Sequence, residues 1–130
     1  LGVVGGTPVL MLPGYPVACI VNAVQFLRPL LKRVGHLPCE PLPSVEATLA
    51  RKITSEPGQR TFARVSLEAT DSNGDTNDNT HDCKAVPTRT SGAGVLSSVA
   101  LADGWVAVPE GSEGFAAGET VAVQNWEWSA

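Results

Sequence analysis

Two arginine residues near the middle of the chain could bind an anion together. Arg60 and Arg64 lie four positions apart in the stretch GQRTFARV, so a β-strand would place both on one face with Phe62. The planar guanidinium group donates paired hydrogen bonds to oxyanions such as phosphate. We therefore predict an oxyanion site on this face. The alternative is an ordinary strand face exposed to solvent.

A second candidate is the stiff loop Pro13, Gly14, Tyr15 and Pro16, which precedes a segment of helical periodicity. The first N–H groups of a helix have no intrahelical partner and, with the helix dipole, they attract anions. Gly14 permits a ligand to approach the backbone closely, and the two prolines limit the entropy lost on binding. The loop could bind an anion, or it could be only a turn between a strand and a helix.

Glycine and hydroxyl residues form a third candidate in the stretch TSGAGVLSS, residues 90–98. Ser91 can donate a hydrogen bond from its hydroxyl group, and Gly92 can donate one from an accessible backbone N–H. Such a turn could bind an oxyanion. An ordinary loop before a short apolar segment explains the same pattern.

Two polar clusters imitate metal sites without meeting the requirements of one. Residues 71–77 have the alternating Asp and Asn of a calcium loop, but Thr76 occupies the position that requires glycine. Residues 81–83, HDC, are adjacent in sequence, and adjacency does not give the geometry of a metal or catalytic site. We therefore predict no catalytic and no metal-ligating residues in this chain.

The elements around the proline-glycine loop form a first structural unit, residues 1–35. The apolar run TPVLML at residues 7–12 ends at a proline-glycine pair, which is typical of a buried strand in a parallel sheet. Apolar residues then recur at helical spacing up to Gly35, where the helix should end. Pro29 lies inside this helix and predicts a kink near residues 26–28, because it removes one intrahelical hydrogen bond.

Three prolines within residues 36–43 indicate an extended linker, after which apolar residues alternate with polar ones. This alternation predicts strands around Val45–Ile53, Ala63–Ala69, Val106–Val108 and Val121–Val123. Residues 44–130 should therefore form a small all-β barrel or sandwich. Residues 71–82 contain no apolar side chain and are predicted to be a mobile hairpin tip.

Composition restricts the class of protein. A chain of 130 residues can bury a single modest core, and no apolar run approaches the ~18 residues of a membrane span. The net charge of −4, with no basic run longer than a pair such as Lys32-Arg33, argues against nucleic acid as a partner. Three cysteines without a CxxC pair fit a reducing compartment, so we expect a soluble cytoplasmic protein.

Five motifs in a fixed order resemble those of one protein family. They are GGTPVLMLPGYPV, FLRPLLKRVG, GQRTFARV, GVLSSVALADGWVAVP and EGFAAGETVAV. Together they closely resemble the carboxy-terminal region of the molybdopterin molybdotransferases, the family of MoeA and the gephyrin E domain. The resemblance implies an α/β fragment, namely the terminal strand and helix of a molybdopterin-binding domain, followed by a small all-β barrel domain.

The resemblance also implies an activity in molybdenum cofactor biosynthesis. The implied enzyme is a homodimer that hydrolyses adenylylated molybdopterin with a divalent cation, usually magnesium, in a cleft between two domains. Molybdate is transferred to the dithiolene sulfurs, and AMP is released. The substrates would be small molecules. The acidic ligands of the cation would precede Leu1, so we expect this chain to be inactive alone.

Individual site residues follow from the same resemblance. Pro13, Gly14 and Pro16 match the family's proline-glycine loop beside the pterin and molybdate site, with Tyr15 in a place where Asn is frequent. Arg64 matches an arginine that the barrel contributes to the same cleft. The resemblance and the chemistry of the residues thus converge on one side chain.

The glycine-rich turn matches the family less directly. The family's serine after the barrel glycine, here Gly92, falls at Ala93, and Ser91 is the hydroxyl residue that could replace it. A different class of function is also open, because gephyrin-like relatives use this architecture as a scaffold for protein interaction. An exposed apolar groove on the barrel would favour such a non-catalytic binding module.

Overall fold

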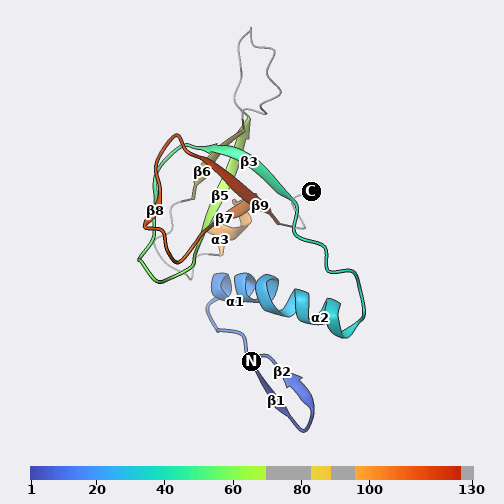
Figure 1. Cartoon of the computed structure of the whole chain (residues 1–130). Coiled ribbons are helices and arrows are strands. Elements are labelled where there is room, and N and C mark those ends of the chain that lie inside the picture. The colour runs from blue at the N-terminus through green and yellow to red at the C-terminus, as the bar shows by residue number, and fades with distance from the viewer. Residues whose placement is uncertain (70–82, 89–95, 127–130) are drawn as a thin grey trace. The chain divides into compact units, whose positions relative to one another are not determined.

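The computed structural model describes residues 1–69, 83–88 and 96–126 of the chain. These residues form two compact units (Figure 1). One unit comprises Leu1–Pro41 and Leu96, and the other comprises the remaining described residues. The predicted hairpin tip at 71–82 and the candidate residues Ser91 and Gly92 lie outside the described ranges. No helix within those ranges is long and apolar enough to cross a membrane.

The first unit begins with a two-stranded hairpin and not with a buried strand. β1 (Gly2–Val4) pairs antiparallel with β2 (Thr7–Val9), and the residues of both strands are exposed. The φ angles of Gly5 (54°) and Gly6 (80°) are positive, as a two-residue turn between antiparallel strands requires. The prediction of a buried parallel strand over residues 7–12 is therefore wrong, because this turn supplies an adjacent antiparallel partner.

One helical segment follows, as predicted, and Gly35 caps its end. It consists of α1 (Pro16–Asn22), the π-helical η1 (Ala23–Leu27) and α2 (Arg28–Val34). The π-helical turn lies where the sequence predicts a distortion, just before Pro29. Since Pro29 has no N–H and its ring crowds the preceding turn, the backbone widens there, and the Arg28 N–H bonds to the Ala23 carbonyl.

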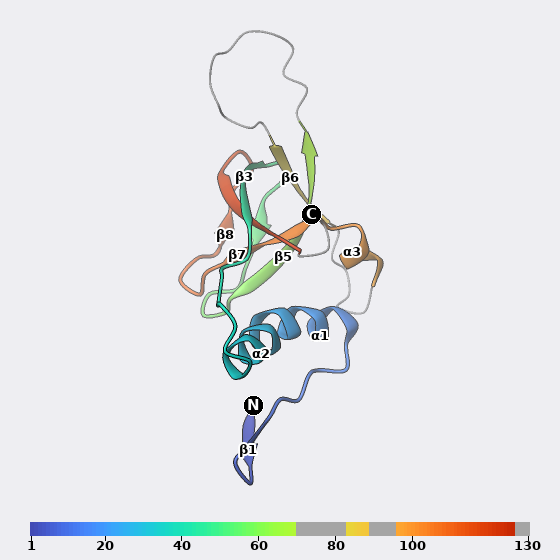
Figure 2. The same ribbon diagram turned by 90° about the vertical axis from the view of Figure 1, so that its right-hand side faces the viewer.

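The second unit is a closed five-stranded barrel with strand order β3-β6-β5-β7-β9 (Figures 1 and 2). Its strands are β3 (Ser44–Leu49), β5 (Thr61–Ala69), β6 (Cys83–Pro87), β7 (Gly104–Val108) and β9 (Thr120–Asn125). Neighbouring strands are antiparallel except β3 and β6. Two short strands, β4 (Ile53–Thr54) and β8 (Gly114–Phe115), pair separately, and α3 (Ser97–Ala100) precedes β7. The prediction of a small all-β unit is confirmed, and of the two predicted forms it is the barrel and not the sandwich.

Alternate residues of the barrel strands fill its interior. The buried core consists of Ala47, Leu49, Ile53, Val65, Ala85, Val106, Val108, Val121 and Val123. Ala63 and Leu67 pack against this core together with Val65, so the residues between them on β5 face outward. The predicted sidedness of this strand is confirmed, and it places Arg64 on the outer face of the barrel.

Candidate functional site

Arg64 is a buried cation on the outer face of β5. Only 7% of the residue is exposed, and burial lowers the pKa of its guanidinium group. Its backbone carbonyl accepts hydrogen bonds from the Thr88 N–H at 2.9 Å and the Thr88 hydroxyl at 3.2 Å, which fix the strand at this point. Its Nε–H has no hydrogen-bond partner within the described ranges. A buried donor without an acceptor costs about 1–3 kcal/mol, so the position favours an anionic ligand.

Two tryptophans lie on the same face of the barrel as Arg64. Trp105 is the partner of Arg64 in the β5–β7 register and of Gln124 in the β7–β9 register. Trp105 and Trp126 are each 1% exposed, and their ring centroids lie 4.3 Å apart at an interplanar angle of 55°. Neither tryptophan was predicted from the sequence to be a site residue. The sequence did contain a signal for the position of Trp105. Trp105 precedes Val106, and side chains that neighbour an inward-facing residue of a strand point to the outer face.

Arg60 lies in a different environment from Arg64. It precedes β5, and its Nη2 lies 3.2 Å from Oε2 of Glu110, with both side chains more than half exposed. A hydrogen bond with its own backbone lowers the pKa of Glu110, and the charge of Arg60 lowers it further. The solvent-exposed alternative therefore describes Arg60, whereas Arg64 is buried. A role for Arg60 in oxyanion binding stays a prediction.

The loop of the first unit adopts the predicted transition into a helix. Tyr15 has extended backbone angles (φ −75°, ψ 125°) and occupies the cap position before Pro16, the first residue of α1. The Tyr15 carbonyl accepts the Cys19 N–H at 2.8 Å, and the Tyr15 side chain is 67% exposed. The part of Pro13, Gly14, Tyr15 and Pro16 in anion binding stays a prediction.

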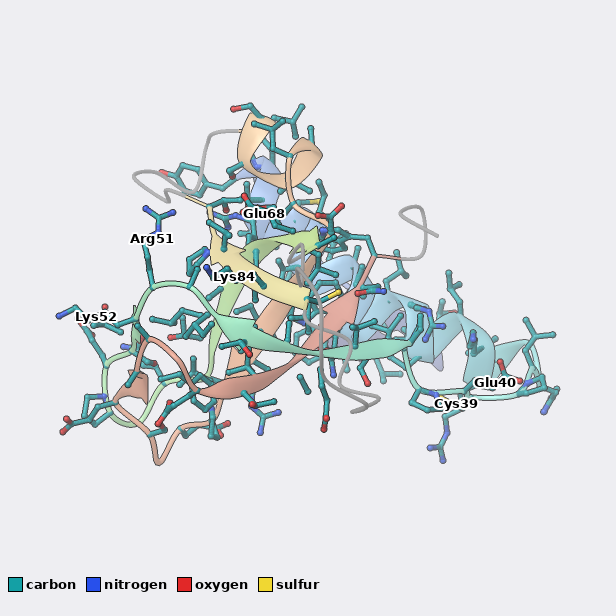
Figure 3. All side chains as sticks on the ribbon, turned by 90° about the horizontal axis from the view of Figure 1, so that it is seen from above. Cys39, Glu40, Arg51, Lys52, Glu68 and Lys84 are labelled. Atoms are coloured by element: carbon teal, nitrogen blue, oxygen red, sulfur yellow. The ribbon has the colours of Figure 1, made fainter. Side chains whose placement is uncertain are left out.

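A groove of about 660 Å³ lies on the barrel beside the β4–β8 pair. It is lined by Ala50, Arg51, Lys52, Ile53, Thr54, Glu113, Gly114, Phe115, Ala116 and Ala117. Arg51 and Lys52 extend outward from the turn after β3 (Figure 3), and Nη2 of Arg51 donates to the Pro87 carbonyl at 2.7 Å. The groove therefore combines a largely apolar lining with two neighbouring cations and one carboxylate, Glu113.

The described part of the chain offers no set of metal ligands. No three His, Cys, Asp or Glu side chains within it gather closely enough to hold a metal ion. The magnesium ion that the family resemblance implies thus has no ligand set among these residues. Cys19, Cys39 and Cys83 are free thiols.

Comparison with known proteins identifies the barrel. The family model of the MoeA C-terminal region (domain IV) matches residues 46–126. A Methanocaldococcus jannaschii protein whose name places it in molybdopterin biosynthesis is 33% identical over 123 residues, which cover 94% of this chain and 25% of that protein. Molybdopterin molybdenumtransferase 2 of Mycobacterium tuberculosis is 40% identical over 68 residues, which cover 52% of this chain and 17% of that protein.

Solved structures share the same arrangement. Two structures of a molybdopterin biosynthesis MoeA protein from Pyrococcus horikoshii superpose with TM-scores of 0.70 and 0.68, at 25% and 36% sequence identity. They match 87% and 95% of this chain, which correspond to 26% and 27% of their own. The chain thus spans about a quarter of the length of these relatives. With the family model matching more than half of its residues, this chain belongs to the MoeA C-terminal region (domain IV) family.

Proposed function

We propose that this chain is part of a molybdopterin molybdotransferase, which inserts molybdate into adenylylated molybdopterin and releases AMP in molybdenum cofactor biosynthesis. The enzyme would act on these small-molecule substrates as a cytoplasmic homodimer. The observation that carries the proposal is the burial of Arg64 on β5. The family resemblance assigns this residue to the substrate cleft. The names of the relatives, which refer to molybdopterin biosynthesis and molybdenum transfer, support the proposal.

The chemistry of the reaction explains why a buried arginine suits it. Both substrates carry oxyanion groups, and transfer of molybdate requires that a dianion approach a second anionic molecule. A fixed cationic donor stabilises such charge most strongly where water is excluded. Arg64 combines a permanent positive charge with a rigid set of donors, and its burial keeps the surroundings poorly hydrated.

Other residues would contribute in supporting roles. Pro13, Gly14, Tyr15 and Pro16 would offer a preformed loop against an anionic group of the substrate. Magnesium, expected from the family, would neutralise charge when bound, but the described residues do not supply its ligands. The share of this chain in the reaction is therefore the binding and orientation of oxyanions.

The proposal is tested on the full-length protein. Purified protein is given adenylylated molybdopterin, magnesium and molybdate, and both AMP and molybdenum cofactor are quantified. We expect cofactor formation that depends on molybdate. The isolated 130-residue chain should show no turnover and only weak anion binding that declines as ionic strength rises. An inactive full-length protein, or rapid turnover by the isolated chain, would contradict the proposal.

The groove beside β4 and β8 favours a second candidate, a module that binds a peptide. Phe115, Ala116 and Ala117 contribute apolar surface, and Arg51 and Lys52 outnumber the one carboxylate of the lining, Glu113. The chain as a whole carries a net charge of −4, so this pair is a local exception. The matching occupant is an extended peptide with an apolar side chain next to an acidic one.

Charge reversal at the groove tests this candidate. Peptides are selected from a random library on the immobilised protein, and their affinities are measured for Lys52→Glu and for Lys84→Glu. Lys84 is an exposed residue of β6 and does not line the groove, so it provides a matched control (Figure 3). Lys52→Glu should weaken binding roughly 2- to 5-fold, as loss of an exposed ion pair does, and Lys84→Glu should not. Equal affinities, or failure to select any peptide, would rule the module out.

A further inference from the structure

We propose that the indole N–H of Trp105 is a second oxyanion donor, which acts together with Arg64 on one ligand. This inference rests on the proposed oxyanion-binding role of Arg64 and adds a residue that the family resemblance does not supply. It is drawn from the register of two barrel strands, the burial of both side chains and their hydrogen-bonding state.

The strand register brings the two side chains together. Arg64 and Trp105 are direct partners across the antiparallel pair β5–β7. Directly opposed residues of such a pair have Cβ atoms about 4.5–5.5 Å apart and project to the same side. Val65 and Val106, their neighbours along the chain, belong to the core, so both Arg64 and Trp105 face outward. Two long side chains with N–H donors thus start from adjacent points of one surface.

Both donors are buried and lack an acceptor. Arg64 is 7% exposed and Trp105 is 1% exposed. Neither Nε of Arg64 nor Nε1 of Trp105 has a hydrogen-bond partner among the residues that the structure describes. Buried polar groups of native proteins are paired in roughly nine cases out of ten, so two unpaired donors on partnered residues require an explanation. A ligand acceptor that reaches both would account for the pair.

The chemistry of the donors defines the ligand. Indole and guanidinium groups donate hydrogen bonds and accept none, so the ligand must present acceptor atoms. The positive charge of Arg64 selects an anion. A tetrahedral oxyanion meets both conditions, because separate oxygens of one group can accept from the two residues. Molybdate and the phosphate of the adenylylated substrate share this chemistry.

Trp126 serves as a positioning residue for the second donor. Its ring lies against that of Trp105, with centroids 4.3 Å apart. Its backbone N–H donates to the Asp103 carbonyl at 3.1 Å, and the Asp103 carboxylate accepts the Leu67 N–H at 2.7 Å. These bonds tie the end of β9 to β7 and β5. The tilted ring of Trp126 therefore limits the rotation of the Trp105 indole and fixes the direction of its N–H.

Trp105→Phe is the decisive variant, because it retains an aromatic ring and removes only the donor and part of the ring system. Binding of molybdate and of inorganic phosphate to the full-length protein is measured by calorimetry for the wild type, Trp105→Phe, Arg64→Ala and the control Lys84→Ala. Thermal melting verifies the fold of each. Trp105→Phe should weaken the binding of one of the two anions about 10-fold, as loss of a donor to a charged group does. Lys84→Ala should change the binding of neither anion.

The identity of the affected anion distinguishes the two sources. Weaker molybdate binding assigns the donor pair to the incoming metal oxyanion, and weaker phosphate binding assigns it to the substrate phosphate. If Arg64→Ala weakens binding and Trp105→Phe does not, the inference about Trp105 is wrong while the proposed function stands. If neither variant changes binding of either anion, the proposed role of Arg64 is wrong as well.

A spectroscopic measurement on the wild-type protein makes the test independent of the variant's stability. One indole N–H resonance should move downfield when the full-length protein is saturated with molybdate or phosphate, because the proton enters a charge-assisted hydrogen bond. The same resonance should be missing from the spectrum of Trp105→Phe. An indole spectrum unaffected by both anions would overturn the inference.

Discussion

Replacing Arg64 with alanine is expected to lower kcat/KM for molybdate insertion by roughly 100- to 1,000-fold in the full-length protein. Removal of one preorganised donor to a developing oxyanion has an effect of this size in other enzymes. The burial of Arg64 should place it toward the upper part of that range, since little water can replace the lost charge. The measurement is the initial rate of cofactor formation as molybdate is varied.

Two further variants test whether the loss of activity in Arg64→Ala comes from the guanidinium group itself. Arg64→Lys keeps the charge but loses the planar fork and Nε, so it should recover only part of the activity. Lys84→Ala removes one positive charge from the exposed surface of the neighbouring strand and should behave as wild type. Wild-type kinetics for Arg64→Ala would exclude the arginine from the reaction.

Gly104→Ala is expected to destabilise the barrel by about 2–3 kcal/mol, in the range of severe overpacking. A Cβ atom at this position would lie 2.3 Å from the backbone oxygen of Gln124 and 3.0 Å from Cγ1 of Val123. Because the nearest atom belongs to the backbone, β7 and β9 must separate to admit the methyl group. That pairing is part of the closed ring of strands, so the local shift weakens the whole unit.

Chemical denaturation with a matched glycine variant measures this effect. A Cβ atom added at Gly111 would meet no neighbouring atom within 4 Å, and Gly111→Ala should change the unfolding free energy by less than ~0.5 kcal/mol. The midpoint for Gly104→Ala should fall clearly below both the wild type and Gly111→Ala. Equal midpoints for the two variants would mean that the β7–β9 pair can open to admit a methyl group at little energetic cost.

The sequence predicted those parts of the fold that depend on local pattern. Alternation of apolar residues located β3, β5, β7 and β9, because each of these strands buries one face. Helical periodicity and the missing N–H of Pro29 located the helix and its distortion. β6 was not predicted, and its parallel pairing with β3 depends on residues distant in sequence. The hairpin at the start was missed because the apolar run concealed the turn signal of Gly5 and Gly6.

The candidate site was predictable only in part, for a related reason. Spacing placed Arg60 and Arg64 on one side of a strand, and guanidinium chemistry suggested an oxyanion. Spacing could not distinguish the two residues, since their exposure depends on partners from other strands. Glu110 pairs with Arg60, whereas Trp105 lies beside Arg64, and each partner lies more than 40 positions after its arginine in the sequence. Cross-strand register therefore carries the information that local pattern lacks.

Closure of the barrel has a consequence for how this domain can diversify. Since β9 pairs with both β3 and β7, each of the five barrel strands has a neighbour on either side, and a foreign strand finds no free edge of the barrel sheet to extend. Recognition must then proceed through outward side chains, whose replacement leaves the ring of strands intact. Such a scaffold can exchange one outward side chain for another with little risk of edge-to-edge strand pairing between copies.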